Sequence, residues 1–287
     1  MINKLGIIAS AKRTANLLLD TYPNANHAFS LRKLRTAYDG FVVKVRDDST
    51  DNEADVSFDA DNSVSDSSAV SNLTGGSGAT LGDWRGSNVY VVKWYDQSGN
   101  GFDISQSSES FQPKMINSNS YYLRGGNNRV SLRGHGDQLI ESTSSTIDQP
   151  VTVVAVTDVN NIRSAGRYVC DGGQATSAGD RQILIQLNSD FEMYAGSFKG
   201  SRTVTLDEWQ WFALFNGSSS ELSMNGTNET SLDIGTMGCK GLSLFGRYNA
   251  GSTWRGVIQE FVQWEADRSA ERSDIEAAVN EYYATYS

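Results

Sequence analysis

The chain has 287 residues, a formal net charge of −10 and a pI near 4.7. This acidic balance argues against a nucleic-acid partner and against anionic membrane surfaces, because both select basic proteins. Hydrophobic residues make up 38% of the chain and only 3 residues are proline, so the chain can build a core and is not disordered. No apolar run approaches the roughly 20 residues of a membrane span, so we expect no membrane insertion.

The beginning of the chain predicts an N-terminal arm, which we assign to residues 1–26 and to assembly or docking. Its apolar run is too short for a signal peptide and Lys12 follows at once, so we expect synthesis in a cytoplasm. Residues 27–287 are expected to form one sandwich domain. Within it, apolar residues recur at near-helical spacing from His27 to Tyr38, which predicts an amphipathic helix there.

The rest of the chain alternates short apolar runs with turn residues, a pattern typical of β-strands. Residues 150–158 are the strongest β-branched run, and residues 88–95 predict a central strand. A C-terminal helix is expected after Ala266, with Asp267 or Ser269 as its cap. Further strands are predicted at 41–45, 114–116, 121–123 and 130–132, and hairpins at 181–194 and 209–224.

The stretch from Leu242 to Trp264 predicts two more strands joined by a turn. In the second strand, Ile258, Val262 and Trp264 fall on one face. Glu260 falls on the same apolar side, so it must be hydrogen-bonded or a β-bulge must shift the register there. These short, turn-punctuated strands together predict an all-β sandwich.

No cofactor is predicted. Residues 47–82 contain eight carboxylates and could hold a structural calcium ion, but residues 51–55 lack the glycine of an EF-hand loop. A solvated loop is therefore the preferred interpretation, and we assign no metal ligands. Cys170 and Cys239 are expected to be separate buried residues, with a single disulfide as the alternative.

Isolated carboxylates give no clear catalytic pattern. Asp158, Asp171 and Asp180 each lie beside turn residues and are most simply turn formers. Among the aromatic residues, Trp209 and Trp211 share a strand face and are expected to pack in the core or at its rim.

Two segments resemble known families. The run Trp94–Gly101, preceded by Phe29–Gly40, resembles the catalytic domain of arabinofuranosidase B and related phage virion proteins. The segments Leu244–Arg247 and Trp254–Phe261 are similar to laminin-G and pentraxin-type sandwiches. The resemblance implies a concanavalin A-like jelly-roll β-sandwich with an N-terminal arm or helix and a C-terminal helix.

The same resemblance implies that the catalytic groups are lost. It places Asn188 at the nucleophile position and Arg247 or Tyr248 at the position of the acid, and none of these is a carboxylate. The vicinal cysteine pair of that family is also missing, because Asp171 follows Cys170. A shift of register would bring Asp190 or Glu192 to the nucleophile position instead.

We therefore expect a non-catalytic phage virion structural protein, in the tail or as a capsid decoration on the head surface. It would be made in the host cytoplasm, form homo-oligomers, contact other virion proteins and display a lectin-like surface to a cell-surface glycan. The alternative is a glycoside hydrolase of arabinofuranosidase type that acts on surface polysaccharide. The candidate ligand-binding residues are Trp84 on a glycine-rich loop and, at one end of the sandwich, Arg247, Tyr248, Trp254 and Arg255.

Overall fold

Two strands form the middle of the structure, and every residue of both is buried: β12 (Val151–Val159) and β21 (Gly256–Trp264). They pair antiparallel, and β17 (Glu208–Phe215) pairs with the other edge of β12. β-branched and aromatic side chains dominate all three, as a pleated surface buried on both faces requires. The computed structural model describes residues 17–59, 62–64, 88–118, 120–124, 126–134, 136, 139–159, 166–172, 180–247 and 252–287, without the side chains of residues 140–145.

The first sheet extends in both directions from this centre, in the order β3–β2–β4–β6–β10–β21–β12–β17–β18–β19. A further strand, β1, pairs with β21 beside β10, and β7 pairs with β6. The additional bounds are β1 (His27–Ser30), β2 (Val43–Asp47), β3 (Glu53–Val56), β4 (Val89–Trp94), β6 (Lys114–Asn117), β7 (Ser120–Tyr121), β10 (Leu132–Arg133), β18 (Ser220–Met224) and β19 (Thr227–Leu232).

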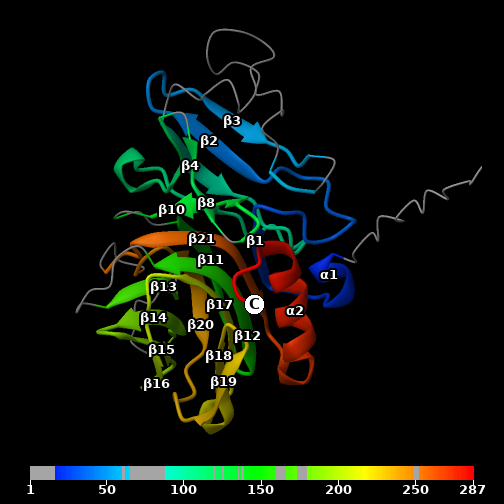
Figure 1. Cartoon of the computed structure of the whole chain (residues 1–287), viewed down its shortest axis with the longest axis vertical. Coiled ribbons are helices and arrows are strands. Elements are labelled where there is room, and N and C mark those ends of the chain that lie inside the picture. Colours follow the sequence, from blue (N-terminus) through cyan, green and yellow to red (C-terminus); the bar gives the residue numbers. More distant parts are fainter. Residues whose placement is uncertain are drawn as a thin grey trace, which may run out of the picture.

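The second sheet has the order β5–β11–β20–β13–β14–β15–β16. Because β5 also pairs with β4, the two sheets are continuous. Figure 1 shows β2–β4 at one end of the molecule and β14–β16 with β18 and β19 at the other. The bounds are β5 (Ile104–Ser105), β11 (Leu139–Ile147), β13 (Arg167–Asp171), β14 (Ile183–Leu187), β15 (Asp190–Tyr194), β16 (Phe198–Thr203) and β20 (Cys239–Leu244), with a separate hairpin β8 (Leu123–Arg124) and β9 (Arg129–Val130).

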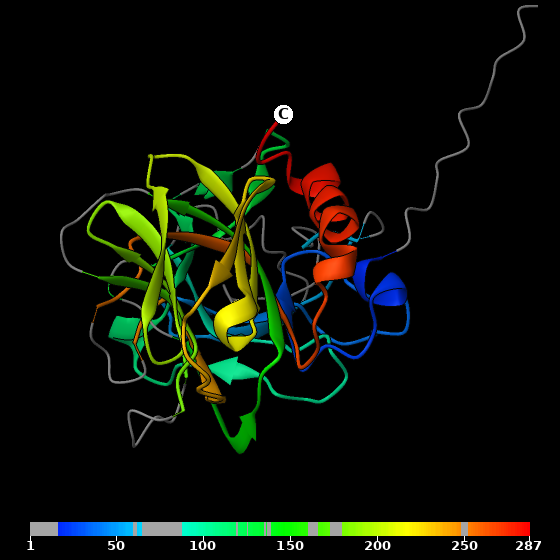
Figure 2. The ribbon, with the colours of Figure 1, turned by 90° about the horizontal axis from the view of Figure 1, so that it is seen from below.

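Two hydrophobic clusters explain this arrangement. The larger lies between the sheets and joins Val153 and Phe261 of the first to Leu184 and Leu244 of the second. The smaller lies on the outer face of β12, β17 and β21, beneath α2 (Arg272–Tyr283) and α1 (Leu18–Thr21). Figure 2 shows α2 standing beside the strands with α1 next to it. No helix in the described part of the chain is long and apolar enough to cross a membrane.

The all-β sandwich with a C-terminal helix is confirmed, but the helix predicted for residues 27–38 is wrong. Residues 27–30 form β1 instead, and the Leu34 amide donates to Gln97 Oε1 (2.8 Å). The reason is that this segment contributes side chains to both hydrophobic clusters. Phe29 and Leu31 contact the larger one, whereas Ala28 and Leu34 contact the smaller one, and this division imitates helical spacing.

The two strands predicted in 242–264 are confirmed, but a simple turn does not join them as neighbours. β20 pairs with β11 and β13, whereas β21 pairs with β1, β10 and β12, so the connection crosses between sheets. Both expectations for Glu260 are confirmed: it is hydrogen-bonded, and the register with β12 shifts beside it. The shift turns Ile258 toward the larger cluster with Phe261, whereas Val262 and Trp264 face the smaller one.

The remaining local predictions hold with small changes of boundary. The hairpins β14–β15 and β17–β18 are confirmed. A short 3₁₀ turn, η4 (Ser269–Glu271), precedes α2. Asp267 Oδ1 accepts from the Ser269 amide (2.9 Å), but the N-cap of η4 is Arg268 and that of α2 is Glu271, so the predicted cap, Asp267 or Ser269, is wrong. Cys170 and Cys239 are buried and form no disulfide, and burial raises the pKa of the Cys170 thiol well above its usual value.

Candidate functional site

A pocket of about 790 Å³ opens on the outer face of the first sheet, where β12 ends and β17 begins. Asp158 and Glu208 form its floor and lie directly opposite each other in the register. The residues next to them, Val159 and Trp209, belong to the larger cluster, so the two carboxylates point away from it. Opposed residues of an antiparallel pair have Cβ atoms about 4.5–5.5 Å apart, which places these two acids side by side.

The walls of the pocket come from the hairpin β8–β9 and the end of α2. The helix ends at Ala284, which adopts a left-handed conformation (φ 53°) and whose carbonyl accepts from the Gly126 amide (3.1 Å). Asn127 Nδ2 donates to the Tyr282 carbonyl (2.8 Å), one of the last carbonyl groups of the helix. These bonds fix the hairpin against the helix and hold Arg124 above the floor.

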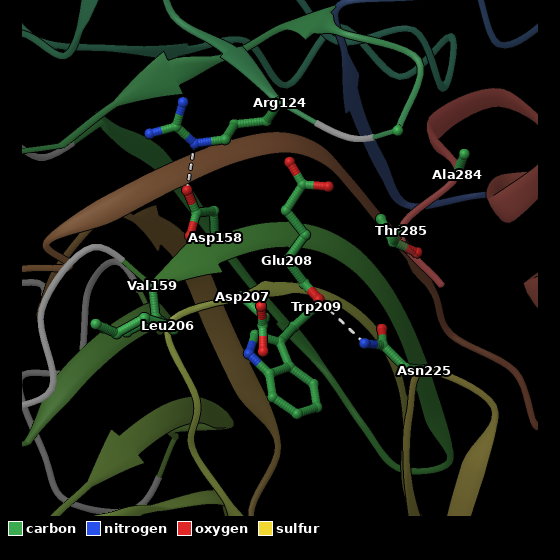
Figure 3. A pocket seen from close by; sticks show the side chains of 11 residues that line it. Arg124, Asp158, Val159, Leu206, Asp207, Glu208, Trp209, Asn225, Ala284 and Thr285 are labelled. Carbon is green, nitrogen blue, oxygen red and sulfur yellow. Dashed lines mark hydrogen bonds and ion pairs between the residues drawn. The ribbon is translucent and has the colours of Figure 1, made fainter. Parts of the chain in front are cut away.

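Arg124 forms a close ion pair with Asp158 through its Nε atom. Figure 3 shows the Asp158 and Glu208 side chains pointing to the same side, toward Arg124. Asp158 is 6% exposed, and burial raises its pKa; the charge of Asp207 adds to the rise, and Arg124 opposes it. Glu208 is only half-buried, so the two facing acids have different surroundings.

The rim adds further polar groups, whereas the Trp209 ring faces the larger cluster. Trp209 is 8% exposed, and its indole N–H donates to the Thr205 carbonyl (3.3 Å). Asp207 is exposed and accepts from the Thr205 hydroxyl (2.8 Å), while Leu206 beside it is 61% exposed. Carboxylates and a guanidinium can bind sugar hydroxyls.

Among the described residues, neither the candidate ligand contacts nor the replaced catalytic positions named from the sequence line this pocket. Asn188 lies exposed in the β14–β15 turn, and Arg247 is half-buried just after β20. Trp254 was expected in a contact patch, but its side chain is 1% exposed and its indole N–H donates to the Val257 carbonyl (3.2 Å). It belongs to the core, because the connection between the sheets passes there. Arg255 is half-buried, and Trp84 and Tyr248 lie outside the described residues.

Of the positions named by the family resemblance, Cys170 and Asp171 lie on β13, which pairs with both β14 and β20, while Asn188 directly follows β14 and Arg247 lies shortly after β20. Asp171 is fully buried there and held by Arg181 through two hydrogen bonds of 2.9 and 2.7 Å. Glu192, on β15, is half-buried; burial raises its pKa and Asp190 adds to the rise. Glu192 is therefore a second candidate acid, outside the pocket.

Asp158 was interpreted from the sequence as a turn former, and Glu208 was not singled out. The sequence predicted both strands, but it did not predict that they pair, which places the end of β12 beside the start of β17. That pairing joins residues 50 positions apart, and nothing local in the sequence specifies it. In the ranges that the structure describes, no group of three His, Cys, Asp or Glu side chains could hold a metal ion. Most of residues 47–82, interpreted as a solvated loop with a calcium site as the alternative, lies outside those ranges.

Comparison with known proteins gives similarity at the level of the fold. No protein-family model matches the chain, and no curated protein matches its sequence. An arabinofuranosidase complexed with arabinofuranosyl-α-1,2-xylobiose superposes with a TM-score of 0.61 at 15% identity, covering 91% of this chain. A mutant GH54 α-L-arabinofuranosidase soaked with a nitrophenyl arabinofuranoside gives 0.62 at 15% identity, covering 94%. The chain spans 64–65% of the length of these two enzymes and has a β-sandwich fold similar to theirs.

Proposed function

We propose that this chain binds a glycan in the pocket over β12 and β17 and cleaves a glycosidic bond there. The observation that carries the proposal is the pair of opposed acids, Asp158 and Glu208, on the floor of a pocket large enough for a short oligosaccharide. The similarity in fold to arabinofuranosidases supports it, although at 15% identity it supports the scaffold and not the chemistry.

The two acids have different roles in this proposal. Asp158, whose pKa burial raises, is the general acid: it gives its proton to the leaving oxygen as the C–O bond breaks. Glu208 attacks the anomeric carbon from the other side and forms a glycosyl ester. Water then hydrolyses the ester, with Asp158 taking the proton from that water. Retaining enzymes hold their carboxyl groups about 5–5.5 Å apart, and direct opposition across the ladder favours this short separation.

The test is sugar release from a panel of chromogenic glycosides and polysaccharides. We expect Asp158→Asn and Glu208→Gln to lose about 10²–10⁴-fold in kcat/KM, with Glu265→Gln, an exposed acid, as the matched control. If only Glu192→Gln lost activity, the catalytic acid would be Glu192 on β15 and not an acid of this pocket. If the wild-type chain released no sugar from any substrate, the hydrolase proposal would be rejected.

A second candidate is glycan binding without cleavage, and one observation favours it. The close Arg124–Asp158 pair stabilises the ionised form of the acid, which opposes proton donation. Binding to a glycan array without sugar release would establish this function. In either case the phage-virion location, the contacts with other virion proteins and the homo-oligomer remain predictions. Mass spectrometry of purified phage particles tests the location, and absence of this chain from them would refute it.

A further inference from the structure

A single line of side chains crosses the outer face of the first sheet and leads into the carboxylate pocket. Each member lies directly opposite the next in the strand registers, so all point to the same face. The neighbours Val89, Leu132 and Val159 face the larger cluster, which fixes the line on the outside. Its members, in order from β2 to β17, are Arg46, Tyr90, Lys114, Arg133, Val257, Asp158 and Glu208.

The first half of this line forms a second pocket, of about 690 Å³, that carries cations over aromatic rings. Lys114 Nζ lies 5.0 Å from the centre of the Tyr90 ring, and the Arg133 guanidinium lies 5.1 Å from that of Tyr122. The rings fix both side chains in place while leaving their N–H groups directed at the pocket. Both cations are half-buried.

The cations of this pocket differ in how they are neutralised. Arg46 is held by Asp51 (2.6 Å), and its Nε atom donates to Gln112 (3.0 Å), so it serves the fold. Within the described ranges, no carboxylate lies within ion-pair distance of Lys114 or Arg133. The pocket as a whole holds three cations, Arg46, Lys114 and Arg133, against two carboxylates, Asp48 and Glu109. Because the chain has a net charge of −10, a pocket with more cations than carboxylates is a distinctive binding site for an anion.

The two pockets adjoin. Tyr122 lines the pocket around Lys114 and Arg133, and Arg124 lines the pocket around Asp158 and Glu208. Only Leu123, which is 42% exposed, lies between Tyr122 and Arg124 in the chain. Arg133 is also close enough to Asp158 for its charge to lower the pKa of that carboxyl group. A ligand with the length of an oligosaccharide can therefore contact both pockets across Leu123.

We infer that the glycan recognised by this protein is acidic, and that Lys114 and Arg133 bind the carboxylate or sulfate group of one sugar while the next lies over Asp158 and Glu208. The inference rests on the proposed function, because it names the class of its substrate. Tyr90 and Tyr122 hold the two cations in position from below. A carboxylate of a uronic acid and a sulfate ester present the same chemistry to such a pair: two or three oxygens that share a negative charge.

The experiment measures binding in the Glu208→Gln background, so that hydrolysis cannot remove the ligand. The probes are polygalacturonate, which carries carboxylates, dextran sulfate, which carries sulfate esters, and neutral arabinan. We expect one acidic polymer to bind more tightly than arabinan, and Lys114→Gln/Arg133→Gln to weaken that binding about 10- to 100-fold. The charge-matched control Lys199→Gln/Lys240→Gln, on β16 and β20, should leave it unchanged.

Three results would overturn the inference. They are equal binding by the double variant and its parent, an equal loss in the charge-matched control, and no binding of either acidic polymer. Binding that depends on Lys114 and Arg133 without sugar release by the wild-type chain would reject hydrolysis and keep the acidic ligand. Release of neutral sugar without binding of either acidic polymer would keep hydrolysis and reject the acidic ligand. The two proposals can therefore fail separately.

Discussion

A buried ion pair between Arg32, two residues after β1, and Glu260 of β21 gives the sharpest prediction for stability. Glu260 is fully buried, and Arg32 Nε and Nη2 donate to its two oxygens at 2.8 and 2.9 Å. The Ser30 hydroxyl (2.8 Å) and the Tyr283 hydroxyl (3.0 Å) donate to the same carboxylate, so the network joins two strands to α2. This burial assigns Glu260 a structural role, away from the carboxylate pocket.

Arg32→Met removes both charge-assisted bonds and leaves Glu260 without a counterion, in a place that water does not reach. We expect a loss of about 3–5 kcal/mol in the free energy of unfolding, because the two hydroxyls cannot replace a positive charge. Adding Glu260→Gln should recover more than about 1 kcal/mol, since it removes the uncompensated charge. Lys44→Met, at an exposed pair with Glu53 (3.8 Å), is the control and should cost about 1 kcal/mol or less.

The measurement is urea unfolding followed by tryptophan fluorescence, with the slope of the transition compared among variants. Two results would refute the reasoning. One is a cost for Arg32→Met no larger than that for Lys44→Met. The other is a double variant as unstable as the sum of its single changes, which would mean that the two side chains do not interact.

The remaining predictions concern the pocket and the core. A general acid must be protonated, so activity falls as pH rises through the pKa of Asp158. Because Arg124 lowers that pKa, Arg124→Gln should move the alkaline limb of the kcat/KM profile to higher pH. Because Asp207 raises it, Asp207→Asn should move the limb to lower pH. Shifts in the same direction would contradict this assignment. Gly256→Ala would place a methyl carbon 1.8 Å from the Asp158 carbonyl oxygen. We therefore expect the free energy of unfolding, measured by thermal denaturation, to fall by about 1–3 kcal/mol and sugar release to be lost. A variant with unchanged stability and activity would exclude this close approach. Cys170 and Cys239 should react with a thiol reagent only after denaturation, and rapid reaction of the folded protein would contradict their burial.

Local patterns predicted the elements of this fold better than their pairing. The β-branched run of β12 and the hairpin β14–β15 could be found because their signals lie within about ten neighbouring residues. The segment of Phe29 and Leu34 could not, because its apolar residues contact two different clusters and their spacing imitates a helix. Whether β20 pairs with β21 depends on which distant strands each meets, and no local residue decides that.

The candidate site was missed for the same reason. Asp158 and Glu208 are unremarkable in sequence, and only the long-range ladder between β12 and β17 places them together. The line from Lys114 through Arg133 to Asp158 likewise joins four strands whose pairing is non-local. Trp254, by contrast, was expected in a contact patch at one end of the sandwich, but the crossing between sheets buries it.

The most direct measurement is a crystal structure of Glu208→Gln soaked with an oligosaccharide that the wild-type chain binds. The account predicts a sugar ring over Asp158 and residue 208, with an anionic group of the neighbouring sugar on Lys114 and Arg133. A sugar bound instead on β13–β15 beside Glu192, with the pocket over β12 and β17 empty, would contradict it.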